Sequence, residues 1–253
     1  MFSDQESTAA FFEVQAGLPR QGPGSDASTL RALQCLPDLR PDALVVDLGC
    51  GPGRQTLVLV QALGLKVVAV DTHQPFLDQL LSHAAGCGLS DGIDARNAPM
   101  ETLEFAGESV DLIWAEGSLY LMGVANALHR FRPMLRPGGA IAFTELSWTA
   151  ENPPAEAAEY FSTAYPEMVT VEGNRLKAAA QGYEVVYSFE LPAEDWWTDY
   201  YGPLSERIEL LRPGAGEKPA LQRALETAEE EIRMFTRHGD SYGYVFYIVR
   251  KPE

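Results

Sequence analysis

The stretch VVDLGCGPG, residues 45–53, decides how this chain folds. It begins inside ALVVDLG, residues 43–49, a continuous apolar run typical of a strand that is buried on both faces of a parallel sheet. Gly49, Gly51 and Gly53 let the backbone turn sharply after this strand and approach a ligand closely, because they carry no side chain. A helix is predicted directly after the stretch, and the amides at its start can face bound polar atoms.

Predicted strands and helices alternate on both sides of this stretch. The strands are predicted at residues 43–49, 66–71, 92–95, 110–117, 140–146, 183–191 and 242–250. The helices are predicted at residues 28–36, 54–63, 74–85, 124–135 and 218–238, with more helix within 154–181. Strands that alternate with helices at this spacing imply right-handed βαβ units and a parallel sheet.

A glycine loop after a strand serves two kinds of cofactor, and two residues distinguish them here. The dinucleotide pattern G-x-G-x-x-G needs a small residue at position 54, where this chain has Arg54. Asp47, at the end of the strand, would repel a pyrophosphate but suits an ammonium group. S-adenosylmethionine has no phosphate and carries an ammonium and a sulfonium. The loop therefore favours S-adenosylmethionine, although a glycine turn needed only for tight packing is an alternative.

Acidic residues follow the next two predicted strands. Asp71 ends VVAVD, 18 residues after Gly53, and can accept hydrogen bonds from both ribose hydroxyls, or simply cap the next helix. Asp94 is expected after the weak third strand, where it can accept a hydrogen bond from an adenine amino group while the Ala95 amide reaches a ring nitrogen. A turn-forming aspartate is the alternative for Asp94.

Residues 43–147 resemble the core of the class I S-adenosylmethionine-dependent methyltransferases. The matching pieces are VVDLGCGPG, VVAVD, Asp94-Ala95, VDLIWAEG and LRPGGAIAFTE. The small-molecule branch, similar to the ubiquinone and menaquinone biosynthesis methyltransferases, is nearest. The resemblance implies an α/β fold with a doubly wound, mostly parallel seven-stranded sheet in the order 3-2-1-4-5-7-6, strand 7 antiparallel, and helices on both faces. One departure is that Met100 and Leu103 stand where relatives often have a Leu-Pro-Phe run.

The resemblance also implies one methyltransferase domain over residues 1–253. Its expected parts are N-terminal helices and a loop (1–42), a cofactor-binding core (43–150), and a half with a substrate cap and the last two strands (151–253). The loop LPRQGPGS, residues 18–25, resembles a segment that folds over the cofactor in some family members, and we name it the lid loop. The predicted cofactor contacts are Gly22, Asp47, Gly49, Cys50, Gly51, Gly53, Asp71, Thr72, Asp94, Ala95 and Glu116.

Methyl transfer is an in-line displacement, so the protein must align the acceptor, exclude water and in some cases remove a proton. Glu116 and Glu145 follow the fourth and fifth predicted strands and are the candidate bases or substrate anchors. Either could instead hold the cofactor or cap a helix. The aromatic segment DWWTDYYGPL, residues 195–204, can wall a pocket and bind a cationic amine, or pack a cap onto the sheet. The predicted substrate contacts are Arg20, Tyr120, Trp148, Trp196 and Tyr200.

Composition restricts the partners. The net charge of −17, from 19 basic and 36 acidic residues, makes nucleic acid and anionic membranes poor partners and leaves a small-molecule substrate. The cysteines and histidines are scattered, so no metal site is expected. The polar N-terminal stretch does not resemble a secretory signal, which predicts a cytoplasmic protein, as monomer or homodimer. A nicotinamide-dependent oxidoreductase and an S-adenosylmethionine-binding protein without turnover remain as alternative functions.

Overall fold

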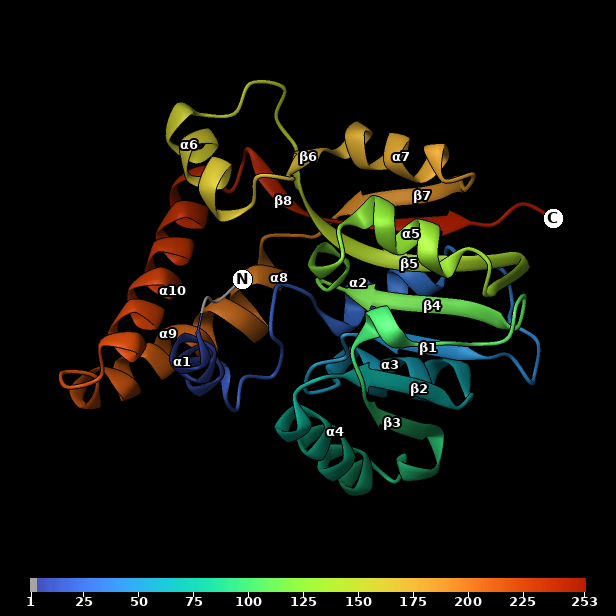
Figure 1. The fold of residues 1–253 in the computed structure, drawn as a ribbon, viewed down its shortest axis with the longest axis horizontal. Helices are drawn as coiled ribbons and strands as arrows, with labels where there is room; N and C mark the ends of the chain where they lie inside the picture. The colour runs from blue at the N-terminus through green and yellow to red at the C-terminus, as the bar shows by residue number, and fades with distance from the viewer. Residues whose placement is uncertain (1–3) are drawn as a thin grey trace.

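A computed structural model describes residues 4–253 of the chain. A central sheet carries helices on both faces, and a layer of further helices lies beside one end of it (Figure 1). The strands are β1 (Val45–Leu48), β2 (Val67–Asp71), β3 (Ile93–Asn97), β4 (Val110–Glu116), β5 (Leu135–Trp148), β6 (Val169–Thr170), β7 (Glu184–Glu190) and β8 (Tyr242–Arg250). The helices are α1 (Gln5–Gln15), α2 (Asp26–Leu33), α3 (Arg54–Leu63), α4 (Gln74–Cys87), α5 (Val124–Phe131), α6 (Ala155–Ala164), α7 (Val171–Ala180), α8 (Glu194–Trp196), α9 (Gly202–Leu211) and α10 (Pro219–His238), with the π-helical turn η4 (Trp197–Tyr201) before α9.

The strands run in the order β3-β2-β1-β4-β5-β8-β7, and β6 pairs with the end of β5. The strand β8 is antiparallel to both of its neighbours, whereas the other pairs are parallel. Counted without β6, this is the order 3-2-1-4-5-7-6, so the predicted fold class is confirmed. The prediction of seven strands missed β6, because a strand of two residues has no alternating pattern to detect.

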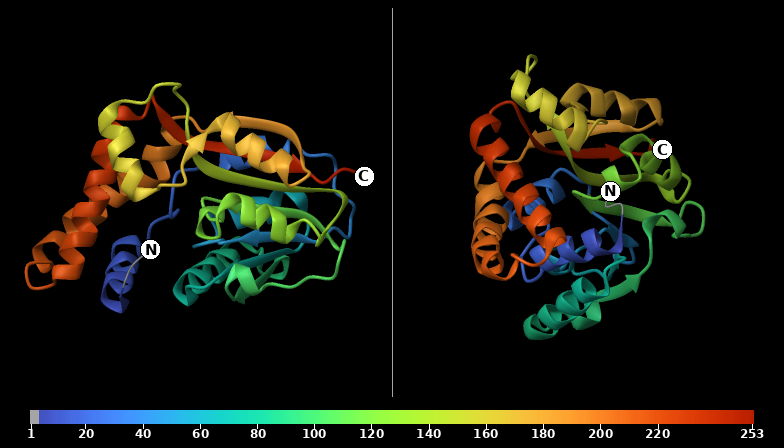
Figure 2. Two further views of the ribbon diagram at one scale, coloured as in Figure 1. Left: turned by 45° about the horizontal axis from the view of Figure 1, so that its top comes forward. Right: turned by 60° about the vertical axis from the view of Figure 1, so that its left-hand side comes forward.

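The two faces of the sheet bury different helices. Side chains alternate along a strand, so Val45 points to one face of β1 and Val46 to the other. The helices α2, α3 and α4 contribute to the apolar cluster on the first face, and α5 and α7 contribute to the cluster on the second. Figure 2 shows these two helix layers on either side of the strands. The core of the protein is therefore formed by both faces of the sheet.

The remaining helices form a separate layer with its own apolar cluster. The layer comprises α1, α6, α8, α9 and α10, and it lies beside the carboxyl ends of the parallel strands (Figures 1 and 2). Helix α1 packs against α9 and α10. The aromatic segment forms α8, η4 and the start of α9, so it belongs to this layer. No helix in residues 4–253 has the length and apolar character needed to cross a membrane.

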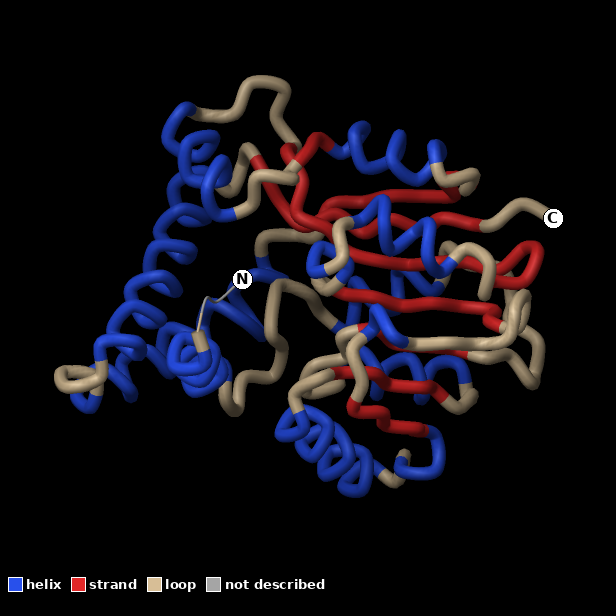
Figure 3. The backbone as a smooth tube through the Cα atoms, in the orientation of Figure 1, coloured by secondary structure: helices blue, strands red, loops and turns tan. Residues whose placement is uncertain are grey.

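Some boundaries differ from the prediction. The third strand continues to Asn97, two residues beyond its predicted end, and the helix predicted to reach Leu135 ends at Phe131. Residues 136–139 form a bulge at the start of β5, because these four residues stand opposite the single residue Asp111 of β4. Figure 3 shows that the loops gather at the two ends of the sheet.

Candidate active site

The glycine loop between β1 and α3 has left-handed backbone at Gly49, Gly51 and Gly53, with φ of 66°, 54° and 83°. At two of these three positions, a side chain would clash with neighbouring residues of the core, so packing alone requires a glycine there. A Cβ on Gly49 would lie 2.5 Å from the Cβ of Ser118, and a Cβ on Gly53 would lie 2.2 Å from the Cδ1 of Leu80. A Cβ on Gly51 would meet only the side chain of Gln21 in the lid loop, at 3.3 Å. Of the three, Gly51 therefore faces the lid loop and not the core.

Asp47 is fully buried at the end of β1, on the face that α3 covers. Its Oδ2 accepts a 2.6 Å hydrogen bond from the Thr56 hydroxyl of α3, whereas Oδ1 has no hydrogen-bond partner in residues 4–253. Burial raises the pKa of this carboxyl group to about 7. A buried oxygen without a partner is unfavourable, so a cationic or N–H group at this place would stabilise the carboxylate.

Asp71 ends β2 and holds two backbone segments. Its Oδ2 accepts from the Gly51 amide at 2.9 Å, and its Oδ1 accepts from the His73 amide at 2.8 Å. It therefore ties the glycine loop to the start of α4, and each oxygen retains a lone pair for a further donor. Thr72 is exposed beside it, and the buried Cys50 donates its amide to Val70 at 2.9 Å. These residues surround the carboxyl ends of β1 and β2.

The expected position of Asp94 and Ala95 is wrong. Both lie within β3 and not after it, where they pair with Val68 and Ala69 in the middle of the sheet. The Asp94 carboxylate is bound to Arg96 at 2.7 Å. The strand ends at Asn97, whose Nδ2 donates to Gln74 at 2.9 Å. Because a strand rises about 3.3 Å per residue, Asp94 stands roughly 10 Å short of the edge where its predicted role would place it.

Glu116, at the end of β4, has a full set of donors. Its Oε2 accepts from Arg20 of the lid loop at 2.8 Å. Its Oε1 accepts from the Thr29 hydroxyl of α2 at 2.7 Å and from the Trp114 indole at 2.9 Å. The side chains of Arg20 and Glu116 are only 4% and 6% exposed, so this is a buried ion pair. Both oxygens of this carboxylate are thus held by donors of the protein, and Arg20 neutralises its charge.

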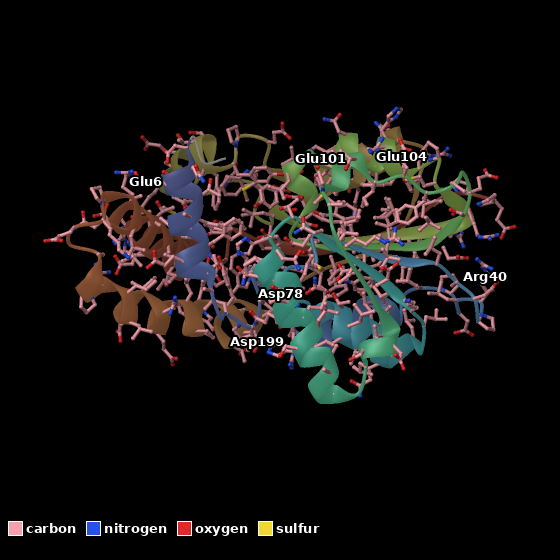
Figure 4. All side chains as sticks on the ribbon, turned by 60° about the horizontal axis from the view of Figure 1, so that its bottom comes forward. Glu6, Arg40, Asp78, Glu101, Glu104 and Asp199 are labelled. Atoms are coloured by element: carbon pink, nitrogen blue, oxygen red, sulfur yellow. The ribbon has the colours of Figure 1, made fainter. Side chains whose placement is uncertain are left out.

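The lid loop touches both the core and the aromatic segment. Asp26, just after it, binds Arg54 of the glycine-loop helix through two hydrogen bonds of 2.8 and 2.7 Å. Gly24 donates its amide to the Asp195 carbonyl at 3.0 Å, and Arg20 Nε lies 4.0 Å from Asp199. Figure 4 shows Asp199 near the middle of the molecule. The two segments predicted to cover the site are thus neighbours.

Arg20 and Gly22 illustrate two different positions in the lid loop. Arg20 is surrounded by the carboxylates of Glu116, Asp26 and Asp199, at 2.8, 3.3 and 4.0 Å. The structure thus places it against three acids of the protein, and its predicted contact with the substrate stays a prediction. A Cβ on Gly22 would meet nothing within 4 Å, so this glycine borders open space.

Glu145, near the end of β5, is buried, with 2% of its surface exposed. Its Oε1 accepts only from the Leu146 amide at 3.2 Å, and its Oε2 has no hydrogen-bond partner in residues 4–253. Burial raises the pKa of this carboxyl group to about 7, while the nearby Tyr165 hydroxyl and the charge of Lys177 favour its ionised form. Glu145 therefore combines deep burial with an unsatisfied oxygen.

Known proteins match both the sequence and the fold. Residues 45–139 match the methyltransferase domain family. Phosphoethanolamine N-methyltransferase 3 of Arabidopsis thaliana is 24% identical over 69% of this chain and 34% of that protein. Trans-aconitate 2-methyltransferase of Paracidovorax citrulli is 26% identical over 69% of this chain and 68% of that protein. A methyltransferase from Thiobacillus denitrificans, solved with S-adenosyl-L-homocysteine, superposes with a TM-score of 0.81 at 17% identity, over 94% of this chain and 96% of that one.

Residues 45–139 thus match a methyltransferase domain, and the fold around them is that of the S-adenosylmethionine-dependent methyltransferases. The chain spans about a third of the length of the Arabidopsis relative. The matched residues contain the glycine loop, Asp47 and Asp71, and they end just before the glutamate of β5. The family match thus concerns the cofactor-binding half of the sheet, and the acceptor side must be argued from this chain's own residues.

The predicted substrate contacts of the methyltransferase divide into packed and accessible side chains. Trp196 is 3% exposed and stacks on Phe235 of α10, with ring centroids 4.0 Å apart, so it packs the helical layer together. Tyr200 is 5% exposed. Tyr120 is 44% exposed and stands edge-on to Tyr165 at 6.0 Å. Trp148 lines, with Tyr165, a hollow of about 170 Å³ between α6 and the end of β5.

Sequence reasoning did not single out Glu231. Glu231 accepts hydrogen bonds from the hydroxyls of Tyr201 at 3.0 Å and Tyr200 at 3.5 Å. Its position on α10 is three residues after the buried Ala228 and four before the buried Phe235. This 3–4 spacing along the apolar stripe is the signal that would have found it. In residues 4–253, no three His, Cys, Asp or Glu side chains are grouped as a metal site requires.

Proposed function

We propose that this methyltransferase binds S-adenosylmethionine at the ends of β1, β2 and β4 and transfers its methyl group to a small-molecule acceptor. The observation that carries the proposal is Asp47, whose Oδ1 is buried at the glycine loop without a partner. A methionine ammonium is a group that this oxygen would bind favourably. In this proposal, residues 43–150 hold the cofactor, and residues 1–42 and 151–253 close the site.

Further residues fit the rest of the cofactor. Asp71 has lone pairs left for ribose hydroxyls after it accepts the amides of Gly51 and His73. Asn97 and Ala98, at the true end of β3, take the place that Asp94 and Ala95 were expected to occupy beside an adenine. When bound, S-adenosylmethionine supplies a methyl group on a positively charged sulfur, and the departing thioether needs no acid.

The lid loop and the aromatic segment exclude water from the reacting groups in this proposal. Their direct contact, from the Gly24 amide to the Asp195 carbonyl, supports joint closure. A second link is the 2.5 Å hydrogen bond from the Ser28 hydroxyl of α2 to the Asp195 carboxylate. Ligand entry then requires at least one of these links to open.

Glu145 is the better candidate for proton transfer or acceptor binding. Glu116 neutralises the buried Arg20 and both of its oxygens accept hydrogen bonds from side chains, whereas Glu145 Oε2 has no hydrogen-bond donor in residues 4–253. A carboxyl group with a pKa near the working pH is also suited to general acid–base catalysis. Glu116 thus positions the lid loop in this proposal, and Glu145 serves the acceptor.

The two alternative functions make different predictions. A nicotinamide-dependent enzyme would place a pyrophosphate at the glycine loop, where the buried Asp47 carboxyl group opposes it. The third-position residue Arg54 is also committed to Asp26. An S-adenosylmethionine-binding protein without turnover would keep all the cofactor contacts, and only a product assay separates it from an enzyme.

Native mass spectrometry of the gently purified protein tests the proposed cofactor. We expect a bound mass equal to S-adenosylmethionine or S-adenosylhomocysteine, retained from the cells or after addition. Bound NADH in place of either molecule would overturn the proposal. The net charge of −17 supports a small-molecule substrate over nucleic acid, and a cytoplasmic monomer or homodimer stays a prediction.

A further inference from the structure

Two carboxylates without an ion pair within 4 Å adjoin one cluster of aromatic side chains in the described part of this protein. The first is Glu145 of β5, whose Oε2 is buried and has no hydrogen-bond partner in residues 4–253. The charge of Lys177 favours its ionised form and the charge of Glu167 opposes it, and in residues 4–253 no ion pair within 4 Å joins Glu145 to Lys177. Its electrostatic environment therefore leaves a negative charge uncompensated at the carboxyl end of the sheet.

The second carboxylate comes from the helical layer. Glu231 of α10 is partly buried and accepts the hydroxyls of Tyr200 and Tyr201, and no cation is among the groups that act on it. The neighbouring residue Glu230 points away and pairs with Arg233 on the surface. One turn of the same helix thus holds a neutralised acid and an acid that only tyrosines contact.

The tyrosines connect the two carboxylates. Burial raises the pKa of the Tyr244 hydroxyl well above its usual range, and the charges of Glu145 and Glu231 both raise it further. Tyr244 also pairs in register with Leu146, the residue after Glu145. Both residues pack against the apolar cluster that contains Tyr200 and Tyr201, the hydrogen-bond donors to Glu231. The Tyr244 hydroxyl would stand 3.8 Å from a Cβ on Gly117, which directly follows β4. The ring thus reaches from the helical layer to the edge where the proposed cofactor residues gather.

We propose that the methyl acceptor is an amine, bound as its ammonium ion between Glu145 and Glu231 and faced by the rings of Tyr120, Tyr165 and Tyr244. This inference rests on the proposed methyl transfer. An ammonium N–H would satisfy the unpartnered Oε2 of Glu145, and tyrosine faces attract a cation. A carboxylic acid or a phosphate ester would meet two uncompensated acids in a chain of net charge −17, so it is disfavoured.

The same carboxylate fits the chemistry that an amine requires. An ammonium nitrogen has no free electron pair, so one proton must leave before it can react. Glu145 takes this proton and becomes a neutral acid. The amine nitrogen then forms a bond to the methyl carbon as the bond from carbon to sulfur breaks, which leaves a methylammonium ion and a neutral thioether. The product is again a cation that the acidic pocket can hold.

Equilibrium binding of matched probes tests this assignment. The probes are 2-phenylethylamine, 2-phenylethanol and 3-phenylpropionate, which differ mainly in the charge of the head group, titrated into protein saturated with S-adenosylhomocysteine. We expect the amine to bind and the carboxylate not to bind. Glu145→Gln and Glu231→Gln should each weaken amine binding about ten- to a hundredfold, whereas the control Glu230→Gln on the same helix should not change it.

The outcomes separate this inference from the proposed function. If the protein binds no S-adenosylhomocysteine, the proposed function fails first. If it binds S-adenosylhomocysteine normally but binds the carboxylate as well as the amine, or no amine at all, the acceptor class is wrong. Unchanged amine affinity in both folded variants, Glu145→Gln and Glu231→Gln, would also overturn the assignment.

Discussion

The ends of β4 and β5 carry two glutamates, Glu116 and Glu145. The sequence gives both the same candidate role, whereas the structure places them in different surroundings. Glu116 pairs in register with Thr144, so Glu145 lies one residue further along and its side chain points to the opposite face of the sheet. On its face, Glu116 accepts hydrogen bonds from Arg20, Thr29 and the Trp114 indole. On the other face, Glu145 keeps an oxygen without a donor.

The difference shows that charge compensation, and not burial, distinguishes the two sites. Both glutamates are deeply buried, with the side chain of Glu116 6% exposed and Glu145 2% exposed. A buried acid that is fully paired holds structure together, whereas a buried acid that lacks a partner is a candidate for binding or catalysis. The end of β4 is thus a structural clamp on the lid loop, and the end of β5 is the proposed acceptor site.

The largest expected effect is on turnover by Glu145→Gln. With an amine acceptor found by screening, we expect the rate of methyl transfer to fall about 10²- to 10⁴-fold, because general base catalysis commonly contributes that much. The measurement is single-turnover formation of the methylated amine. Glu116→Gln, assayed under conditions where it stays folded, should lose much less. An equal loss of methyl-transfer rate in the two variants would contradict the proposed difference between Glu145 and Glu116.

The second expected effect is on the free energy of unfolding, which Glu116→Gln should lower more than Glu145→Gln. Glu116→Gln leaves the buried Arg20 with only the more distant carboxylates of Asp26 and Asp199. Breaking a buried ion pair by removing one partner typically costs about 3–5 kcal/mol, and the remaining acids place this case near 3. Chemical denaturation of wild type and variant measures the free energy of unfolding. A loss below about 1 kcal/mol would mean that the pair is not a clamp.

The third expected effect is a gain in stability, not a loss, and its size depends on pH. Burial raises the pKa of Glu145 from 4.5 to about 7, so the folded protein keeps a proton that the unfolded chain releases. Its contribution to stability is therefore lost as pH rises through that window. Glu145→Gln should match wild type near pH 4 and be more stable at pH 8, by at most about 3 kcal/mol. A stability difference that does not change with pH would contradict the assignment.

The smallest effect concerns the outer link of the lid loop. Asp26 and Arg54 are 39% and 49% exposed, so solvent screens their ion pair. Asp26→Asn should cost no more than about 1 kcal/mol of stability, and the loss should shrink at high salt. Hydrogen exchange should still report faster opening of residues 18–25 in the variant. Unaltered exchange there would show that the inner pair with Glu116 holds the loop alone.

Much of the cofactor side could be predicted from the sequence because it depends on local patterns. The apolar runs predict the strands, and the glycine loop and Asp47 follow one of them directly. The strand order followed from the family resemblance. The position of Asp94 was wrong because β3 is weak in sequence, and the end of a weak strand depends on its pairing with β2.

The acceptor side depends on contacts that local patterns do not contain. The register between β4 and β5 decides which face Glu145 takes, and that register includes a bulge. Likewise, the partner of Arg20 is 96 residues away along the chain. Trp196, a predicted substrate contact, packs on Phe235, whereas Glu231, which the sequence did not single out, accepts a hydrogen bond from Tyr201. Only the helical spacing of Glu231 was readable in advance.

Calorimetric titration with S-adenosylhomocysteine and, separately, with NADH tests the central claim most directly. The account predicts saturable binding of S-adenosylhomocysteine, no binding of NADH, and an affinity for S-adenosylhomocysteine about ten- to a hundredfold weaker in Asp47→Asn, which keeps the shape but not the charge of the unpartnered acid. Tight NADH binding without S-adenosylhomocysteine binding, or full affinity in folded Asp47→Asn, would contradict it.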